Sequence, residues 1–91
     1  HVMEYGREGI RMNAIAPGPT LTPMTTPLFE SEEYAPIMQA LLDQTPANRA
    51  ADAEEISNCI LFLLSPAASN VYGSLLFADG GFDAHVRQDH V

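Results

Sequence analysis

One break in the sequence constrains the fold more than any other feature. The run from Ile10 to Ala16 is almost continuously apolar, and it stops at Pro17-Gly18. Such a run is typical of a β-strand that is covered on both faces. Proline cannot continue a ladder of strand hydrogen bonds, and glycine permits a sharp turn. We therefore predict a strand over residues 10–16, preceded by the end of a helix over residues 1–9.

A second helix and strand follow near the end of the chain. Asp52 and Glu55 have the spacing of a helix capping box, and Ser65-Pro66 ends the apolar pattern that follows them. We predict a helix over residues 52–65 and a buried strand over residues 74–78. The helix stripe consists of Ile56, Cys59, Ile60, Leu63 and Leu64, widened by Leu61 and Phe62.

Residues 17–51, between these two parts, form a long excursion. It contains an amphipathic helix pattern made by Tyr34, Ile37, Met38, Leu41 and Leu42. Ser31 is a suitable N-cap, and Thr45-Pro46 ends the pattern. Long loops that leave the carboxyl end of a strand are often lids or binding elements.

The order of strand, helical crossover and strand predicts an α/β fold with parallel strands, that is, a βαβ unit. Ligands of such sheets bind beyond the carboxyl ends of the strands. Two buried-type strands alone would leave apolar edges open, so the sequence reads as the end of a larger fold. Asp79-Gly80-Gly81 closes the second strand and begins a tail over residues 79–91, which is expected to be polar and loose from Phe82 onward.

Composition narrows the classes of partner. The 91 residues make one small domain at most, and their formal net charge of −8 argues against nucleic acid and anionic membranes. No apolar run is long enough to span a bilayer, and no Cys/His cluster has metal-ligand spacing. The single cysteine, Cys59, is expected to be a buried hydrophobe in a reducing compartment, and we predict a cytoplasmic location.

Two segments are familiar when taken together. GIRMNAIAPGPTLTPM, residues 9–24, resembles the short-chain dehydrogenase/reductase family from the end of the catalytic helix to the proline-glycine loop. ADAEEISNCILFLLSPAASNVYGSLLFADGG, residues 51–81, resembles the last helix and strand of that family. The second segment and its continuation look closest to the hydroxysteroid dehydrogenase/carbonyl reductase branch. The resemblance implies the C-terminal βαβ portion of a doubly wound, Rossmann-like parallel sheet.

The resemblance also implies a cofactor, NAD or NADP, and the residues that meet it. Pro17 and Gly18 would shape the wall beside the nicotinamide. The backbone of Thr20 would meet the carboxamide, and the Thr22 hydroxyl would reach the carboxamide or the pyrophosphate. A proline-stiffened loop suits this task because it loses little entropy on binding. The alternative is that both threonines only cap turns.

The catalytic residues of the family are expected upstream of His1. The family's tyrosine-x-x-x-lysine pair is absent, since this sequence contains no lysine. Its glycine-rich dinucleotide loop is also absent, because Gly6 and Gly9 follow no strand and open no helix. We therefore predict that the 91 residues alone are inactive, and that the complete protein moves hydride between NAD(P) and an alcohol or ketone.

Several lid residues could line a substrate pocket, namely Met24, Leu28, Phe29, Met38, Leu41 and Leu42. Met24 and Leu28 are our candidates for the substrate side. Flexible apolar side chains there suit a bulky, apolar or steroid-like ketone. Asn13, a polar residue in a buried-type strand, is expected to pin a neighbouring loop.

Two further hypotheses remain open. The chain could be a non-catalytic interaction module that forms a homo-oligomer through residues 52–65 and 74–78. It could also be a partly folded fragment without a function of its own.

Overall fold

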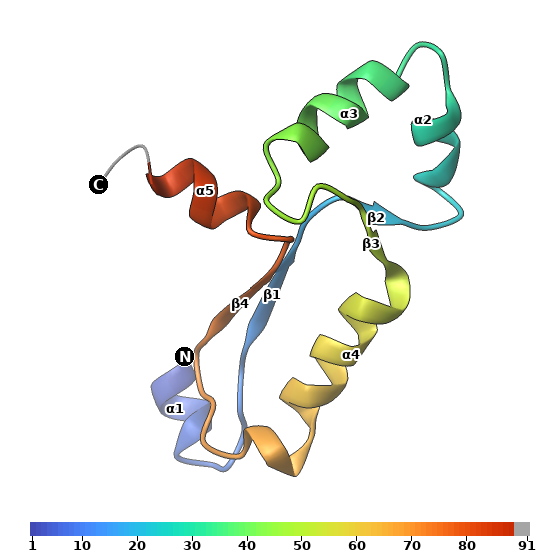
Figure 1. Ribbon diagram of the computed structural model, residues 1–91. Helices are drawn as coiled ribbons and strands as arrows, with labels where there is room; N and C mark the ends of the chain where they lie inside the picture. The colour runs from blue at the N-terminus through green and yellow to red at the C-terminus, as the bar shows by residue number, and fades with distance from the viewer. Residues whose placement is uncertain (89–91) are drawn as a thin grey trace.

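Two parallel strands form the centre of the molecule. In the computed structural model, which describes residues 1–88, β1 (Ala14–Pro17) pairs with β4 (Leu75–Ala78). The pairing is parallel and runs from Ala14 opposite Leu75 to Pro17 opposite Ala78. Figure 1 shows the two strands side by side, with the helices of the crossover between them in sequence. The predicted α/β class and parallel pairing are confirmed.

The first strand begins later than the sequence indicated. The prediction of a strand from residue 10 was wrong, because β1 begins only at Ala14. Its partner decides the start: the Ala14 N–H donates to the Ser74 carbonyl at 2.9 Å, and just before it Gly73 turns with a φ of 72°. An apolar run can form a ladder only where a neighbouring strand is extended. The second strand agrees with its predicted range, 74–78, to within one residue.

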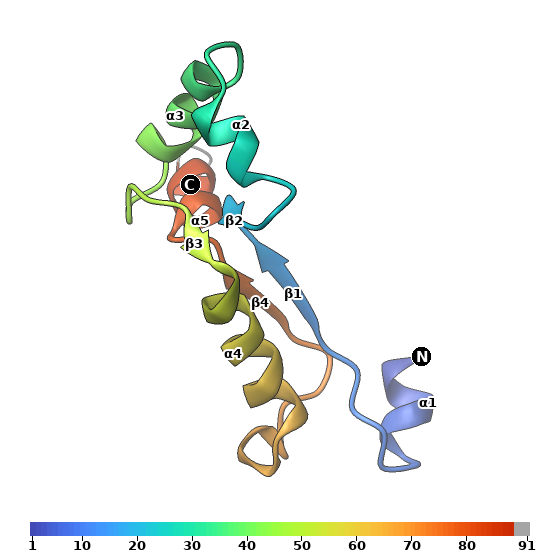
Figure 2. The ribbon, with the colours of Figure 1, turned by 90° about the vertical axis from the view of Figure 1, so that its right-hand side faces the viewer.

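The long helix α4 (Ala53–Leu64) packs along one side of the strand pair, as Figure 2 shows. It begins with the predicted capping box, in which the Asp52 N–H donates to Glu55 Oε1 at 3.0 Å. It ends at Ser65, whose Oγ donates to the Phe62 carbonyl at 2.7 Å. The predicted helix over residues 52–65 is therefore confirmed.

Two polar side chains fasten the amino end of β1 to the segment that follows α4. The Arg11 guanidinium donates to the Leu63 carbonyl at 2.7 Å and to the Ser65 carbonyl at 3.4 Å. These carbonyls lie at the negative end of the helix dipole, where a cation is stabilising. Asn13 has the pinning role predicted for it, as described next.

The Asn13 amide bridges two parts of one loop. Its Nδ2 donates to the Val71 carbonyl at 2.9 Å, and its Oδ1 accepts a hydrogen bond from the Ser74 N–H at 2.9 Å. Both halves of the amide therefore have partners. The loop that they hold leads from the short 3₁₀ helix η1 (Pro66–Ala68) into β4.

The excursion after β1 forms a lid at the opposite end of the strands (Figure 1). It contains β2 (Thr20–Leu21), α2 (Thr26–Glu30), α3 (Ala35–Asp43) and β3 (Ala51–Asp52), and β2 pairs in parallel with β3. The predicted helix corresponds to α3. Its predicted N-cap was wrong, because Ser31 instead accepts from the Glu33 N–H in the turn before α3. The short helix α2 was not predicted.

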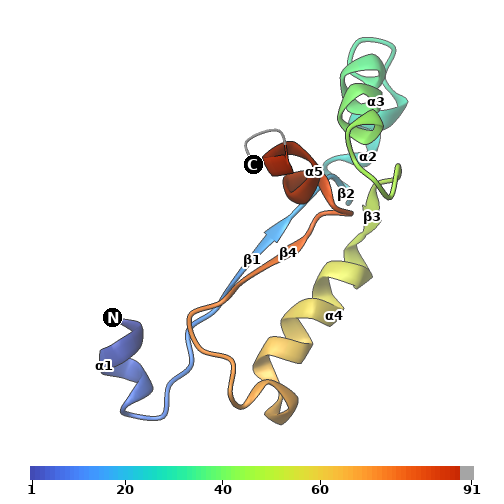
Figure 3. The ribbon, with the colours of Figure 1, turned by 60° about the vertical axis from the view of Figure 1, so that its left-hand side comes forward.

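The two ends of the described chain are helical. At the amino end, α1 (Val2–Gly6) is followed by a left-handed Gly9, with a φ of 82°. The expected helix over residues 1–9 is thus a short helix with a closing turn. At the other end, α5 (Phe82–Gln88) lies at the same end of the strands as the lid (Figure 3). The expectation of a loose tail was wrong for these residues, and residues 89–91 lie outside the described part.

The fold encloses little core of its own. The radius of gyration is 16.0 Å, whereas a compact chain of this length has about 12 Å. Within residues 1–88, only Leu63 and Ala68 are buried hydrophobic residues. Leu61 and Leu64 on α4 remain 63% and 73% exposed, in keeping with the prediction that this helix needs neighbours on more than one side.

Candidate functional site

The loop from Pro17 to Pro19 lies at the carboxyl end of β1, where ligands of parallel sheets bind. The Gly18 N–H donates to the Ala78 carbonyl at 3.2 Å, which extends the contact between β1 and β4 into the loop. A Cβ atom added to Gly18 would lie 2.8 Å from the Cα of Asp79. A glycine is needed here because any side chain would push the two backbones apart.

Both the side chain and the backbone of Thr20 make hydrogen bonds within the loop. Its Oγ1 donates to the Gly18 carbonyl at 2.8 Å, and its own carbonyl accepts from Thr25 Oγ1. It also pairs with Ala51 in the β2–β3 ladder. This position is therefore fixed before any ligand arrives.

Thr22 and Thr25 cap each other at the start of α2. The Thr22 N–H donates to Thr25 Oγ1 at 2.9 Å, and the Thr25 N–H donates to Thr22 Oγ1 at 3.1 Å. The two hydroxyl oxygens lie 3.1 Å apart. Since Thr25 Oγ1 donates to the Thr20 carbonyl, the Thr22 hydroxyl is left to donate to Thr25 Oγ1. Turn capping by the threonines, the alternative considered above, is thus present in the structure.

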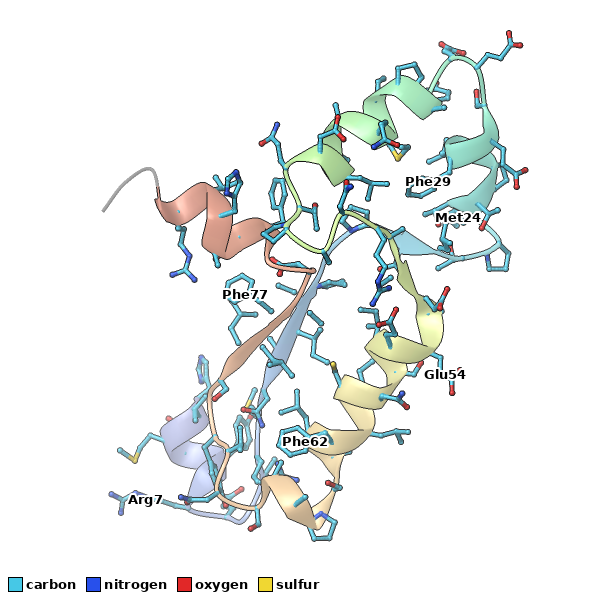
Figure 4. All side chains as sticks on the ribbon, viewed as in Figure 1. Arg7, Met24, Phe29, Glu54, Phe62 and Phe77 are labelled. Atoms are coloured by element: carbon cyan, nitrogen blue, oxygen red, sulfur yellow. The ribbon has the colours of Figure 1, made fainter. Side chains whose placement is uncertain are left out.

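An apolar chamber of about 420 Å³ opens beside this loop. The lid contributes Leu28 and Phe29 from α2 and Met38 and Leu41 from α3, and Phe82 closes it from α5. Figure 4 labels Phe29 on α2, beside α3. Thr20 and Thr25 are the polar residues among those that line the chamber. The chamber therefore combines apolar walls with a few fixed hydrogen-bonding groups at one side, the usual composition of a small-molecule site.

The structure brings together four of the six site residues proposed from the sequence. Pro17, Gly18, Thr20 and Leu28 line the chamber. The other two do not: Thr22 faces Thr25 as described, and Met24 is 85% exposed on the loop into α2 (Figure 4). The placement of Met24 gives no support to its proposed role on the substrate side.

Sequence reasoning missed three lining residues, namely Pro19, Thr25 and Phe82. A local signal existed for Phe82. Asp79 followed by two glycines and then Phe82 is an acceptable helix start, with an aspartate cap before the first helical residue. Nothing local indicated that this helix would face the lid.

A second cavity, of about 250 Å³, lies at the carboxyl ends of the central strands, between Pro19, residues 78–80, the loop before β3 and the first turns of α4. Arg49 forms a two-pronged ion pair with Glu55, with 2.7 Å from Nη1 to Oε1 and 2.8 Å between the second nitrogen and oxygen. The hydrogen bonds from Arg49 and from the Asp52 N–H lower the pKa of Glu55 to about 2. A carboxylate held so firmly in its charged form is unsuited to proton transfer near neutral pH, so this pair is structural.

The described residues show no metal centre and no helix suited to crossing a membrane. Across residues 1–88, no three His, Cys, Asp or Glu side chains are grouped to hold a metal ion. None of the described helices combines the length and the apolar character that a bilayer crossing requires.

Comparison with known proteins agrees with this geometry. A family model described as Enoyl-(Acyl carrier protein) reductase matches residues 2–83. The chain belongs to the short-chain dehydrogenase/reductase family. Galactitol 2-dehydrogenase (L-tagatose-forming) of Cereibacter sphaeroides is 43% identical over 79 residues, which are 87% of this chain and 30% of the relative. The 3-alpha-hydroxysteroid dehydrogenase/carbonyl reductase of Comamonas testosteroni is 39% identical over 83 residues, 91% of this chain and 32% of the relative.

Solved structures of short-chain dehydrogenases/reductases share the fold. The 3-alpha-hydroxysteroid dehydrogenase of Pseudomonas sp. B-0831, complexed with NADH, superposes with a TM-score of 0.80 at 34% identity, covering 96% of this chain and 34% of that one. An Agrobacterium tumefaciens protein assigned as a 2-deoxy-D-gluconate 3-dehydrogenase, with bound NADP, gives 0.82 at 38% identity, with coverage of 91% and 32%. The chain thus spans about a third of the length of the relatives it matches.

Proposed function

We propose that this chain supplies the cofactor-closing loop and the substrate lid of an NAD(P)-dependent oxidoreductase that interconverts an alcohol and a ketone. The observation that carries the proposal is the pre-fixed loop from Pro17 to Thr22 at the carboxyl end of β1, placed beside an apolar chamber. Relatives solved with NADH or NADP have the same fold over this region.

The loop suits a nicotinamide group, which is a flat, largely apolar ring bearing one carboxamide. Extended backbone at Thr20 offers the N–H and C=O groups that an amide can pair with. The Thr22 hydroxyl can exchange its Thr25 partner for a polar atom of the cofactor. When bound, the cofactor supplies the hydride acceptor or donor, while the residues of this chain bind and orient it and exclude water.

The chamber favours an apolar substrate. Its lid walls are formed by the aliphatic and aromatic side chains of Leu28, Phe29, Met38 and Leu41. The names of the relatives include both a polyol dehydrogenase and a hydroxysteroid dehydrogenase, so they leave the substrate class open. The apolar walls of the chamber favour a neutral alicyclic alcohol or ketone as the substrate.

The test uses the complete gene product. It is incubated with NAD⁺ or NADP⁺ and a set of alicyclic alcohols, and the reduced nicotinamide is followed by its near-ultraviolet absorbance. Thr22→Ala should raise the cofactor Kd roughly tenfold, the equivalent of one hydrogen bond. Thr22→Ser keeps the hydroxyl and should retain most of the affinity. Cofactor affinity that is unchanged in Thr22→Ala would count against the loop assignment.

A second candidate function is assembly with another copy of this chain, for which the exposed apolar residues of α4 and β4 are suited. Leu61, Phe62 and Leu64 on α4 and Leu75 and Phe77 on β4 are exposed and carry no charge, so two copies can meet there despite the chain's negative charge. In a two-fold symmetric dimer the same surface of both copies meets, so a charge on that surface would face its own copy. Sedimentation at high concentration checks it, and a purely monomeric species would overturn it.

A cytoplasmic location also stays a prediction, checked by cell fractionation.

A further inference from the structure

Phe82 closes the chamber from a part of the chain that the sequence marked as a tail. It is the first residue of α5 and is half-buried, and it faces the same chamber as the loop and the lid. The other walls come from residues 17–41. Among the described residues that line the chamber, only Phe82 comes from the part of the chain that follows α4.

Asp79 fixes where Phe82 lies. Its Oδ1 accepts from the Gly81 N–H at 3.0 Å, and its Oδ2 accepts from the Asp83 N–H at 2.9 Å. Both carboxylate oxygens are thus used to begin α5 directly after β4. The first turn of α5 has little freedom to move relative to the end of the strand.

The same aspartate abuts the cofactor loop. The Cα of Asp79 lies so close to Gly18 that no side chain fits at position 18. The loop and the segment that leads into α5 are consequently in contact through Gly18 and Asp79, and Phe82 follows this contact by three residues.

The second half of α5 is fastened back to the strand. The Arg87 guanidinium lies over the Phe77 ring, 5.5 Å from its centroid, and it forms an ion pair with Asp83 one turn earlier. Figure 4 labels Phe77 on β4, beneath the start of α5. Such a cation–π contact adds to the hold on the helix. Phe77 itself is not part of the chamber wall.

We propose that Phe82 is a specificity-determining residue, a fixed wall that sets how large an alicyclic group the chamber admits. The proposal rests on the proposed function for the identity of the substrate, a neutral alicyclic alcohol or ketone. The Asp79 carboxylate holds the first turn of α5, so the volume of the Phe82 side chain limits the ligand. Replacing the ring by a smaller or larger group should therefore shift the preference between small and large substrates.

The experiment compares two ketones, cyclohexanone and the bulkier 2-adamantanone, with the complete gene product. Phe82→Ala and Phe82→Leu should raise the ratio of kcat/KM for the bulky over the small ketone, by at least roughly tenfold for alanine. Phe82→Trp should lower that ratio. The Kd for NAD(P) should change by less than about twofold, because the cofactor loop is untouched.

Phe77→Ala is the matched control. It also removes one aromatic ring, the one beneath Arg87 in the last turn of α5, but that ring lies outside the chamber and the Asp79 hydrogen bonds that begin α5 stay in place. A ratio that shifts in the Phe82 variants and not in Phe77→Ala supports the inference. A ratio that is unchanged in the Phe82 variants, or that shifts equally in Phe77→Ala, overturns it.

Failure of the proposed function gives a different result. If the wild-type protein transfers no hydride to either ketone, the oxidoreductase proposal fails, and binding of 2-adamantanone is then measured by saturation-transfer NMR. Binding that Phe82→Trp abolishes would still support Phe82 as the wall of a ligand chamber. Binding that is equal in wild type and Phe82→Trp, or absent in both, would overturn that inference as well.

Discussion

The two ends of the β1–β4 pair are fastened in different ways. At the amino end of β1, Arg11 and Asn13 reach residues that lie more than fifty positions later in the chain. At the carboxyl end, the hydroxyls of Thr20, Thr22 and Thr25 bond to groups within five positions. Long-range anchors make the base of the fold one unit, whereas local ones let the lid change without disturbing the strands.

This difference suits the proposed function. A lid that closes over a ligand must open at small cost, and its hydrogen bonds should survive the motion because both partners move together. The base, by contrast, must keep β1 and β4 in register, since at their carboxyl ends Gly18 and Asp79 meet without room for a side chain.

The largest effect on stability is expected at the base, from Asn13→Ala. This change leaves the Val71 carbonyl and the Ser74 N–H without their side-chain partner. We expect a loss of about 2 kcal/mol in the free energy of unfolding, measured by urea denaturation of the complete gene product, with faster amide exchange at Ser74. Asn58→Ala, at an exposed position on α4, should stay within about 0.5 kcal/mol. Equal effects of the two variants would contradict the assigned anchor.

A somewhat smaller loss is expected from Arg11→Met. The methionine keeps much of the apolar stem but removes both hydrogen bonds to the end of α4. About 1 kcal/mol should be lost, since the guanidinium is only half-buried. The control is Arg7→Met, which changes an exposed arginine on the turn after α1 (Figure 4). If Arg7→Met cost as much, the effect would be one of charge and not of capping.

The lid should respond locally. Thr25→Val preserves the shape of the side chain but deprives the Thr20 carbonyl and the Thr22 N–H of their partner. Amide exchange in α2 should quicken, corresponding to roughly 1 kcal/mol or less of local stability, while Ser74 should exchange as in wild type. Faster exchange both in α2 and at Ser74 would show that the lid and the base of the fold are coupled, and it would contradict the distinction drawn between them.

The smallest effect is expected from the exposed pair of Arg49 and Glu55, which connects the loop before β3 to α4. The pKa of Glu55 is lowered from 4.5 to about 2. A lowered pKa means that the pair stabilises the fold fully above the unfolded value and loses this contribution as the pH falls from about 4.5 toward 2. Arg49→Gln should reduce the acid sensitivity in this window. Glu54→Gln should not, and an identical pH profile in all three proteins would refute the assignment.

Much of the fold follows from local pattern. The spacing of Asp52 and Glu55 predicted the start of α4, and Pro17-Gly18 predicted the end of β1 to within a residue. The sequence also predicted that Asn13 would hold a neighbouring loop, because a polar side chain in a buried-type strand needs hydrogen-bond partners. Within the site, Pro17, Gly18, Thr20 and Leu28 line one chamber, while their roles toward a cofactor or a substrate stay predictions.

The remainder was decided by contacts that no local pattern encodes. β1 begins at Ala14 because its partner becomes extended only at Ser74. The ring of Phe82 joins a chamber built mainly from residues 17–41 because Asp79 packs against Gly18. By itself the sequence determined α3, α4 and the turn after β1, since these depend on neighbours three or four positions away. The long helical crossover between the two strands indicated their parallel order. The strand register and the chamber depended on residues some sixty positions apart, which only tertiary packing brings together.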